Sequence, residues 1–351
     1  MTKSLFPLAR AGLFALDAER AHALTISGLG AWGRAGAPLG RDAAAFPRLA
    51  CRVAGLAFAN PIGLAAGVDK DGLAIRGLFG LGFGAVEIGT LTPLPQAGNP
   101  RPRLFRLVED GAVVNRMGFN NGGLAAALAR VHRLRNHGGI VGINVGANKD
   151  SVDRVADYRL GVLRASDVGD YVTINISSPN TAGLRDLQHG QALAELLAAC
   201  LTVRGTTPLF LKVAPDLDAA AIDGVARAAI EAGIDVLVVG NTTVTRPGLR
   251  SPNAGEAGGL SGAPLAALAA ERLADFRQAT GGAMPMVAVG GIASGAEAYA
   301  RIRAGASLVQ LYTGLVYEGP ALPLRMLREL DACLERDGFE SVAAAVGTAA
   351  R

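Results

Sequence analysis

The chain has 351 residues and half of them are hydrophobic, which is enough for one large barrel domain or two ordinary domains with a sizeable core. Its formal net charge is +4, and residues 1–52 contain seven basic and three acidic side chains, so this stretch carries the whole excess. The remainder has no basic stripe with interleaved aromatic residues, which argues against a nucleic-acid-binding protein.

Cysteine and histidine usage excludes several kinds of site. Cys51, Cys200 and Cys333 lie far apart without a CxxC pair, which argues against a disulfide framework, a zinc ribbon and a cysteine-ligated iron–sulfur cluster. The histidines show no HExxH spacing, so we expect no metal site. The chain also has no GxSxG motif and no P-loop, which removes the simplest hydrolase and NTPase interpretations.

Residues 4–34 are predicted to form two short amphipathic helices, with Asp17 as the N-cap of the second. The residues expected on one face of the second helix are Ala21, Leu24, Thr25, Gly28 and Trp32. Two interpretations stay open, a hairpin packed on its own domain or a foot on an anionic membrane surface. No run of 18 apolar residues and no secretory signal occurs, so we expect no transmembrane helix.

Two glycine-rich motifs near the start are weak. Residues 28–33 match GxGxxG, but no strand precedes them, so we interpret the match as chance. Residues 80–84 lead into an apolar segment rather than out of one, and we interpret them as the turn between a helix and a strand.

After a linker rich in Gly, Ala and Pro at 35–50, one pattern repeats. An apolar, β-prone segment ends in Gly, Asn, Lys or Ser, and an Ala-rich helical stretch mostly follows. The segments are 62–67, 84–90, 140–146, 171–177, 208–214, 235–241, 285–291 and 308–314. Continuous apolarity fits parallel strands buried on both faces, and eight strand–helix units predict an α/β fold, a (β/α)8 TIM barrel. We also expect a small hairpin at 51–61 and an insertion at 103–116.

Glycines end the last two predicted strands. Gly290 and Gly291 end the seventh, and Gly314 ends the eighth. Barrel loops at these positions often bind phosphate through backbone N–H groups, which suggests a mononucleotide cofactor or a phosphorylated substrate. A further glycine-rich loop at 258–262 either lines the same pocket or is only a flexible connection.

Lysine is rare, with four residues against thirty arginines. Lys212 ends the fifth predicted strand inside an apolar run, where a buried ammonium needs a partner or an electron-rich ligand. Beside an isoalloxazine ring it would stabilise the reduced, anionic flavin. Lys70 follows the first strand and either serves a flavin edge or substrate carboxylate or is an exposed loop lysine.

Amides and hydroxyls cluster where strands end. Residues 173–181 pass from a β-branched run into Asn, Ser and Pro, which is typical of a strand that ends at a working surface. The asparagines at or near such ends are Asn115, Asn144, Asn175, Asn180 and Asn241. Several amides on one rim favour recognition of an amide-rich ring. From pattern alone, Ser178 is a cap for backbone groups rather than a base.

The chain resembles class-2, quinone-dependent dihydroorotate dehydrogenases over nearly its whole length. The segments that carry the resemblance are 17–25, 60–72, 87–93, 98–107, 115–121, 174–185, 212–216, 241–243, 258–262, 289–292 and 305–314. The resemblance implies an FMN-containing barrel that oxidises dihydroorotate to orotate in pyrimidine (UMP) biosynthesis. Ser178 would then remove the C5 proton while C6 delivers hydride to flavin N5.

The resemblance also implies three sets of binding residues. FMN would be surrounded by Ala66, Gly67, Val68, Asp69, Lys70, Thr90, Asn144, Asn175, Lys212, Gly240, Gly262, Gly291, Tyr312 and Thr313. The pyrimidine and its carboxylate would be held by Lys70, Asn115, Arg116, Met117, Gly118, Phe119, Asn175, Asn180, Asn241 and Thr242. His22 and Arg106 would line a quinone tunnel. Gly240 replaces a common Thr, so any contact with FMN there comes from the backbone, and Thr313 replaces a common Ser.

Three features select the class. Ser178 stands where soluble class-1 enzymes have Cys, the N-terminal extension matches a membrane foot, and no cysteine cluster hints at an iron–sulfur partner subunit. We therefore expect residues 1–40 to form a membrane-associating, quinone-tunnel segment and residues 41–351 the catalytic barrel. Peripheral association with the cytoplasmic face of the cell membrane follows. The competing hypotheses are a soluble dihydroorotate dehydrogenase using fumarate or NAD, a flavin-free phosphate-binding isomerase or synthase, and a nucleotide-binding barrel without catalysis.

Overall fold

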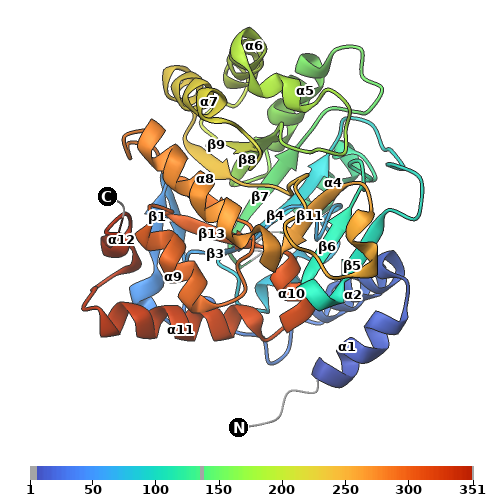
Figure 1. Ribbon diagram of the computed structural model, residues 1–351, viewed down its shortest axis with the longest axis vertical. Helices are drawn as coiled ribbons and strands as arrows, with labels where there is room; N and C mark the ends of the chain where they lie inside the picture. Colours follow the sequence, from blue (N-terminus) through green and yellow to red (C-terminus); the bar gives the residue numbers. More distant parts are fainter. Residues whose placement is uncertain (1–5, 135–137, 350–351) are drawn as a thin grey trace.

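The computed structural model describes residues 6–134 and 138–349, and eight parallel strands form a closed barrel at its centre (Figure 1). Around the barrel the order is β10, β12, β13, β3, β4, β7, β8, β9. The strands are β3 (Ile62–Leu64), β4 (Ala85–Leu91), β7 (Ile140–Val145), β8 (Tyr171–Asn175), β9 (Leu209–Val213), β10 (Val236–Val239), β12 (Met286–Val289) and β13 (Leu308–Leu311). Seven lie within the predicted segments and β4 ends one residue beyond its segment, so the predicted (β/α)8 barrel is confirmed. Their near-complete burial on both faces explains the continuous apolarity.

Helices cover the outside of the barrel (Figure 1). They are α3 (Ile75–Phe79), α4 (Leu124–Arg133), α5 (Arg154–Ala165), α6 (Gly190–Leu201), α7 (Ala219–Ala232), α8 (Ala266–Ala279), α9 (Gly295–Arg303), α10 (Thr313–Glu318), α11 (Leu322–Arg336) and α12 (Val342–Ala345). Side chains of Asp153, Asp218 and Ser294 accept backbone N–H groups in the first turns of α5, α7 and α9. These caps fix where each helix begins after its strand.

A small hairpin and an apolar cluster close the amino-terminal end of the barrel. The hairpin is β1 (Cys51–Val53) paired antiparallel with β2 (Leu56–Phe58), as the sequence predicts. Phe58 packs in a cluster with Tyr171 and Phe210, whose rings stack 4.2 Å apart. Because side chains fill this end, a ligand has room only at the carboxyl ends of the strands.

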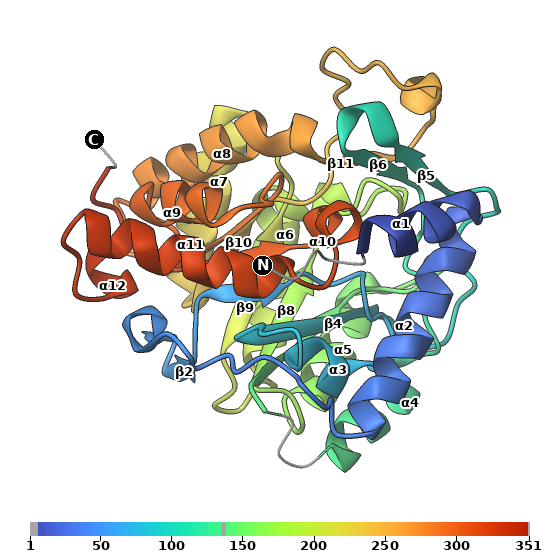
Figure 2. The same ribbon diagram turned by 90° about the horizontal axis from the view of Figure 1, so that it is seen from below.

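A three-stranded antiparallel sheet stands beside those carboxyl ends. The predicted insertion forms β5 (Leu104–Leu107) and β6 (Ala112–Asn115), and β11 (Gly259–Gly262) pairs with β6. Figure 2 shows this sheet next to α1 and α2. The pairing places Asn115 opposite Gly259, so the loop after β10 and the insertion after β4 build one wall.

The N-terminal stretch forms α1 (Phe6–Ala15) and α2 (Ala18–Arg34), and Asp17 caps α2 by accepting the N–H groups of Glu19 and Arg20. The predicted face of α2 is wrong in part, because Leu24 is 57% exposed and Thr25 and Gly28 are also exposed. The buried residues of α2 are Ala21, Ile26, Gly30 and Gly33. Residues of α1 are half-buried or exposed, and none is fully buried.

Glycines explain why the buried face of α2 is turned from the predicted one. A Cβ added to Gly33 would lie 2.5 Å from the backbone nitrogen of Gly77 in α3, and one added to Gly77 would lie 2.1 Å from the carbonyl oxygen of Leu29. The two helices therefore touch backbone to backbone. The GxGxxG match at 28–33 is thus part of a helix-packing contact. Among the described residues, no helix has the length and apolarity needed to cross a membrane.

We expect Gly77→Ala to destabilise the protein although alanine is the better helix former. The added methyl group has no room against Leu29, and overpacking of this kind costs about 1–3 kcal/mol of unfolding free energy. The matched control is Gly224→Ala in α7, where no heavy atom lies within 4 Å of the new Cβ. That change should stabilise by up to about 1 kcal/mol. Denaturant unfolding of both variants checks the contrast, and equal effects would contradict the backbone contact.

Candidate active site

One cavity of about 630 Å³ extends from the barrel's strand ends to the N-terminal helices. At one end it is lined by Asn175, Ser178 and Lys212, which follow or end β8 and β9. At the other end it is lined by Phe6 and Phe14 of α1 and by neighbouring apolar residues of α2. The cavity therefore joins a polar chamber to an apolar passage.

Most of the site residues predicted from the sequence line this cavity. Those that line it are His22, Ala66, Gly67, Val68, Lys70, Thr90, Arg106, Asn115, Met117, Gly118, Phe119, Asn175, Ser178, Asn180, Lys212, Asn241, Thr242, Gly262, Gly291, Tyr312 and Thr313. Those that do not are Asp69, Arg116, Asn144 and Gly240.

Each of these four has a structural place. Asp69 accepts the backbone N–H groups of Leu73 and Ala74 before α3, and burial raises the pKa of its carboxyl. Arg116 forms an ion pair with Glu256 at 2.7 Å, which ties β6 to the loop before β11. Gly240 has φ +120°, and an added Cβ would lie 2.2 Å from the carbonyl oxygen of Val289, so only glycine fits.

Asn144 belongs to a buried polar network that forms the floor of the polar chamber. Its amide donates to Glu87 at 2.7 Å, its oxygen accepts from Thr90 at 2.6 Å, and Asn175 donates to Thr90 at 2.9 Å. Glu87 is fully buried and also accepts from three further donors. These are Tyr171 (3.0 Å), Thr173 (3.1 Å) and Gln310 (2.8 Å). We missed Glu87 as a site residue, although a charge inside an otherwise apolar strand is a visible signal.

Lys212 presents a buried cation to the cavity. Among the described residues its ammonium has no hydrogen-bond or ion-pair partner, and burial lowers its pKa, with the nearby Glu87 carboxylate opposing that effect. A buried ammonium without a partner costs free energy, so this position fits a ligand that carries or acquires negative charge.

Lys70 and His22 lie where the polar chamber meets the passage. Lys70 donates to the carbonyl of Gly67 at 2.8 Å, and burial lowers its pKa to about 8. Burial also lowers the pKa of His22 to about 3, helped by the charge of Lys70, so this imidazole is neutral. Glu19 opposes both effects and is itself held by Arg103 at 2.6 Å, which fixes the start of α2 against the insertion.

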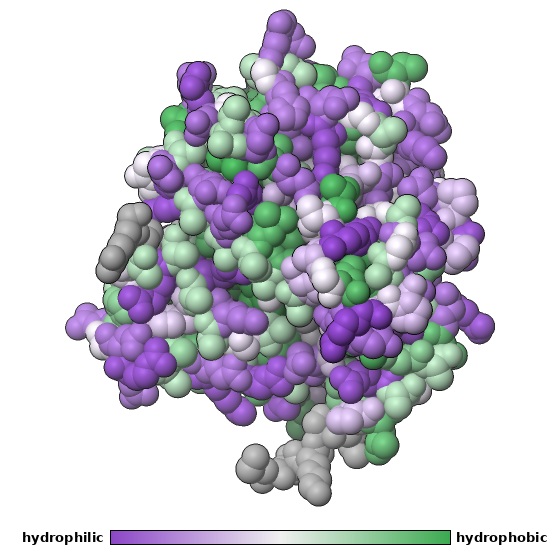
Figure 3. Space-filling model, viewed as in Figure 1, coloured by the Kyte–Doolittle hydropathy of each residue, from purple (hydrophilic) through white to green (hydrophobic). Residues whose placement is uncertain are grey.

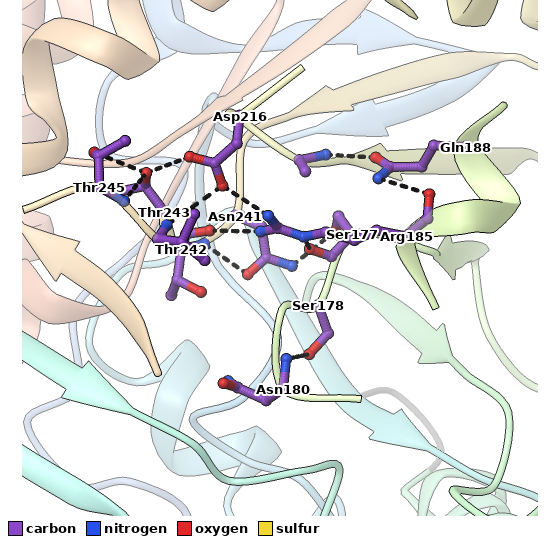
Figure 4. Close-up of polar contacts among 12 residues, drawn as sticks. Ser177, Ser178, Asn180, Arg185, Gln188, Asp216, Asn241, Thr242, Thr243 and Thr245 are labelled. Carbon is purple, nitrogen blue, oxygen red and sulfur yellow. Dashed lines mark hydrogen bonds and ion pairs between the residues drawn. The ribbon is translucent and has the colours of Figure 1, made fainter. Parts of the chain in front are cut away.

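Ser178 lies in the loop after β8, among converging amides (Figure 4). Its buried hydroxyl accepts the backbone N–H of Asn180 at 3.2 Å, and the Asn180 amide donates to Asn115 at 3.2 Å. Asn241 donates to Ser177 at 2.8 Å. These contacts hold several donors and acceptors on one rim, as the sequence predicts.

Thr242 supplies a buried hydroxyl oxygen with no hydrogen-bond partner among the described residues. Such an orphan is costly unless a ligand satisfies it. Thr242 also lines the cavity, so its hydroxyl is a candidate binding group.

Glycine loops line another part of the cavity wall. The backbone N–H groups of Gly291, Thr313 and Gly314 have no hydrogen-bond acceptor among the described residues, and all three residues line the cavity. The Thr313 hydroxyl donates to Ser261 at 2.8 Å. Free N–H groups beside hydroxyls fit a phosphate. Ser261 also lines the cavity, and no sequence signal beyond its glycine-rich loop marks it.

Arg106 stands at the apolar end and holds α1. Its guanidinium donates to the carbonyls of Leu13, Phe14 and Leu16 at 3.0–3.3 Å, and it lies 4.7 Å from the centre of the Phe14 ring. The ring of Tyr317 meets the same Phe14 edge-on at 5.6 Å. A cation at the last carbonyls of a helix is favourable, so Arg106 both lines the passage and anchors its outer wall. We did not identify Tyr317 from the sequence.

Comparisons with known proteins identify the family of the chain. The family model for dihydroorotate dehydrogenase matches residues 48–334. A Novosphingobium aromaticivorans protein named dihydroorotate dehydrogenase (quinone) is 55% identical, with 98% of this chain and 99% of that protein covered. A protein of the same name from Sphingopyxis alaskensis is 54% identical, with 100% and 98% covered.

Similarity to solved structures points to the same family. The crystal structure of DHODH from Eimeria tenella in complex with ferulenol is similar, with a TM-score of 0.88 and 39% identity. The match covers 94% of this chain and 95% of that one. On these matches over nearly its full length, and with the predicted residues gathered around one cavity, the chain belongs to the dihydroorotate dehydrogenase family.

Proposed function

We propose that this protein oxidises (S)-dihydroorotate to orotate, with FMN as hydride acceptor and a membrane quinone as final electron acceptor, in the synthesis of UMP. The observation that carries the proposal is the single cavity with two unlike ends. Its polar end offers amides, hydroxyls and Lys70, and its apolar end opens between two N-terminal helices. Membership of the family implies a flavin, and the full-length relatives bear the name of a quinone-dependent enzyme.

The polar end suits a carboxylated pyrimidine ring. Asn115, Asn180 and Asn241 offer both donors and acceptors, which matches a ring with two amide-like edges. The orphaned hydroxyl of Thr242 and the ammonium of Lys70 add a polar contact and a charge for the carboxylate.

Ser178 acts as the base in this proposal. Its oxygen would take the C5 proton as its own hydroxyl proton is released to water, and bound FMN would supply the acceptor for the hydride from C6. The existing N–H contact from Asn180 stabilises negative charge on that oxygen, which lowers the cost of using a serine as base.

FMN fits the middle of the cavity. The free N–H groups at Gly291, Thr313 and Gly314 suit its phosphate, and the unpaired ammonium of Lys212 suits a ring that becomes anionic on reduction. Bound FMN supplies two-electron chemistry. The chain's own residues orient the reactants around it and exclude water.

The apolar passage suits a quinone, and α1 suits a membrane surface. Phe6, Leu13 and Phe14 line the passage, beside the neutral His22 and the cation of Arg106. Leu8 on α1 is 76% exposed, and Figure 3 shows apolar residues where Figure 1 draws α1. We propose peripheral association with the cytoplasmic face of the cell membrane through α1 and α2, with the segment boundary near residue 40 and without an iron–sulfur partner subunit.

The first test is an anaerobic visible spectrum of the purified protein, followed by dihydroorotate. A yellow protein that bleaches, and regains colour with a soluble quinone, supports flavin, substrate and acceptor together. A yellow protein that does not bleach contradicts the substrate. A colourless protein that cannot be reconstituted with FMN contradicts the cofactor and favours an isomerase or synthase.

Ser178→Ala should retain FMN and slow flavin reduction by dihydroorotate about 10²–10⁴-fold, which is the usual contribution of a general base. Stopped-flow absorbance measures the rate. Ser166→Ala is the matched control, because Ser166 likewise carries a buried hydroxyl but does not line the cavity. Among the described residues this hydroxyl has no hydrogen-bond partner. A Ser178 variant that reduces as fast as the control would rule out this base.

Orotate binding should weaken as pH rises through about 8, the pKa to which burial lowers Lys70. The protonated amine attracts the carboxylate and the neutral amine does not, so the dissociation constant should rise by about tenfold per pH unit above 8. Absorbance titration of the bound flavin measures it. Lys70→Met should remove this dependence, whereas Lys149→Met, an exposed lysine outside the cavity, should keep it. A constant affinity from pH 6 to 9.5 in the unaltered protein contradicts the role of Lys70.

Leu8→Glu should weaken binding to anionic lipid vesicles and slow turnover with a vesicle-embedded long-chain quinone, because it places a charge on the exposed face of α1. Flavin reduction by dihydroorotate should not change. Ile230→Glu is the control, since Ile230 is 47% exposed and belongs to α7, which lies on the far side of the barrel from α1 (Figure 1). Equal vesicle binding by the two variants would refute α1 as the contact.

A further inference from the structure

One guanidinium joins the loops that follow three neighbouring barrel strands. Arg185 begins the short helix η3 (Arg185–Gln188) in the loop after β8. Its Nε donates to the carbonyl of Ser177 at 3.0 Å, Nη1 to the carboxylate of Asp216 at 2.8 Å, and Nη2 to the carbonyl of Thr242 at 3.1 Å (Figure 4). These acceptors follow β8, β9 and β10 respectively.

Asp216 ties the same junction from the other side. Its carboxylate also accepts the hydroxyl of Thr243 and the backbone N–H of Val244 at 3.4 Å. The side chains of Arg185 and Asp216 are 23% and 14% exposed, so solvent screens their attraction only in part. The pair therefore links the β8 loop to the β10 loop through both a charge and directed hydrogen bonds.

The anchored groups sit directly beside the residues proposed to bind and deprotonate the substrate. Ser177 immediately precedes Ser178, and its hydroxyl accepts from Asn241 at 2.8 Å. Thr242 lines the cavity and carries a buried hydroxyl without a hydrogen-bond partner among the described residues. Arg185 itself does not line the cavity. Arg185 therefore holds the Ser177–Ser178 loop and the Asn241–Thr242 loop from outside the cavity.

We propose that Arg185, with Asp216 as its counterion, is a positioning residue that sets the Ser178 loop in register with the Asn241–Thr242 loop. The inference rests on the proposed function, in which both loops contact one carboxylated pyrimidine. A planar guanidinium reaches three acceptors in different directions. The compact ammonium of a lysine keeps the charge but lacks the planar array of N–H donors. Lysine should therefore not restore the function of Arg185.

The test uses the full-length, FMN-loaded protein and the variants Arg185→Gln, Arg185→Lys, Asp216→Asn and the Arg185→Gln/Asp216→Asn double. Flavin reduction at saturating dihydroorotate should slow about 10²-fold in both Arg185 variants, as for a misplacement of about 1 Å. The dissociation constant for orotate, read from the flavin spectrum, should rise in parallel. The double variant should be no slower than Arg185→Gln alone, because either single change already breaks the junction.

Arg154→Gln is the matched control. Arg154 donates to the carbonyl of Ala182 at 2.7 Å, so it holds the same loop from its outer side without bridging two strand ends. It should keep the reduction rate and orotate affinity within about twofold. If Arg185→Gln does not fold, Arg185→Lys and Asp216→Asn carry the test, since both keep size and shape closer to the original.

Three outcomes would overturn the positioning role. They are wild-type rate and orotate affinity in the Arg185 variants, equal losses in Arg154→Gln, and additive losses in the double variant. A lower melting temperature with unchanged rate and affinity would likewise mean that the junction only supports the fold. If dihydroorotate does not reduce the flavin of the unaltered protein, the proposed function fails and this role fails with it. Reduction of the unaltered protein and of the Arg185 variants at one rate rejects the positioning role alone.

Discussion

The buried carboxylate of Glu87 is the interaction on which the rest of the site depends. A carboxylate inside a barrel is tolerated only when donors surround it, and Glu87 accepts hydrogen bonds from side chains on β7, β8 and β13. Through Asn144 and Thr90 the network reaches Asn175, which faces the cavity. It also provides negative charge near Lys212, whose ammonium has no hydrogen-bond or ion-pair partner among the described residues. One side chain thus organises the floor of the chamber and offsets part of the cost of burying the nearby cation.

The fold separates tasks along the length of one cavity. Strand-end loops supply the polar groups, and the β5–β6–β11 sheet brings segments far apart in sequence to a common wall. The N-terminal helices add an apolar extension beyond that wall. The groups that bind a charge, the groups that recognise a ring and the passage for an apolar reactant come from different parts of the chain. Each can therefore change without the others.

Local sequence patterns were enough to predict the barrel, but not the residues that support the cavity-lining residues from outside the cavity. Continuous apolar runs identify parallel strands, and a rare lysine at a strand end identifies Lys212 as buried and cavity-facing. Arg116 was misplaced because its ion pair with Glu256 depends on the β6–β11 pairing, which joins residues about 145 positions apart and has no local signature. Glu87 and Arg185 lie inside the motifs that carry the family resemblance. They act through partners on other strands, so their neighbours in sequence do not reveal what they do.

The backbone contact between α2 and α3 gives the cavity one wall of fixed position. Residues of α2 line the apolar passage, while Gly33 rests against α3 with no side chain between the helices. Side chains can change rotamer and absorb small displacements, but two touching backbones cannot, so α2 can neither slide nor approach further. By contrast α1 has no fully buried residue. The passage therefore has one side fixed by a backbone contact and one side without fully buried residues, so a change in its width needs less repacking at α1 than at α2.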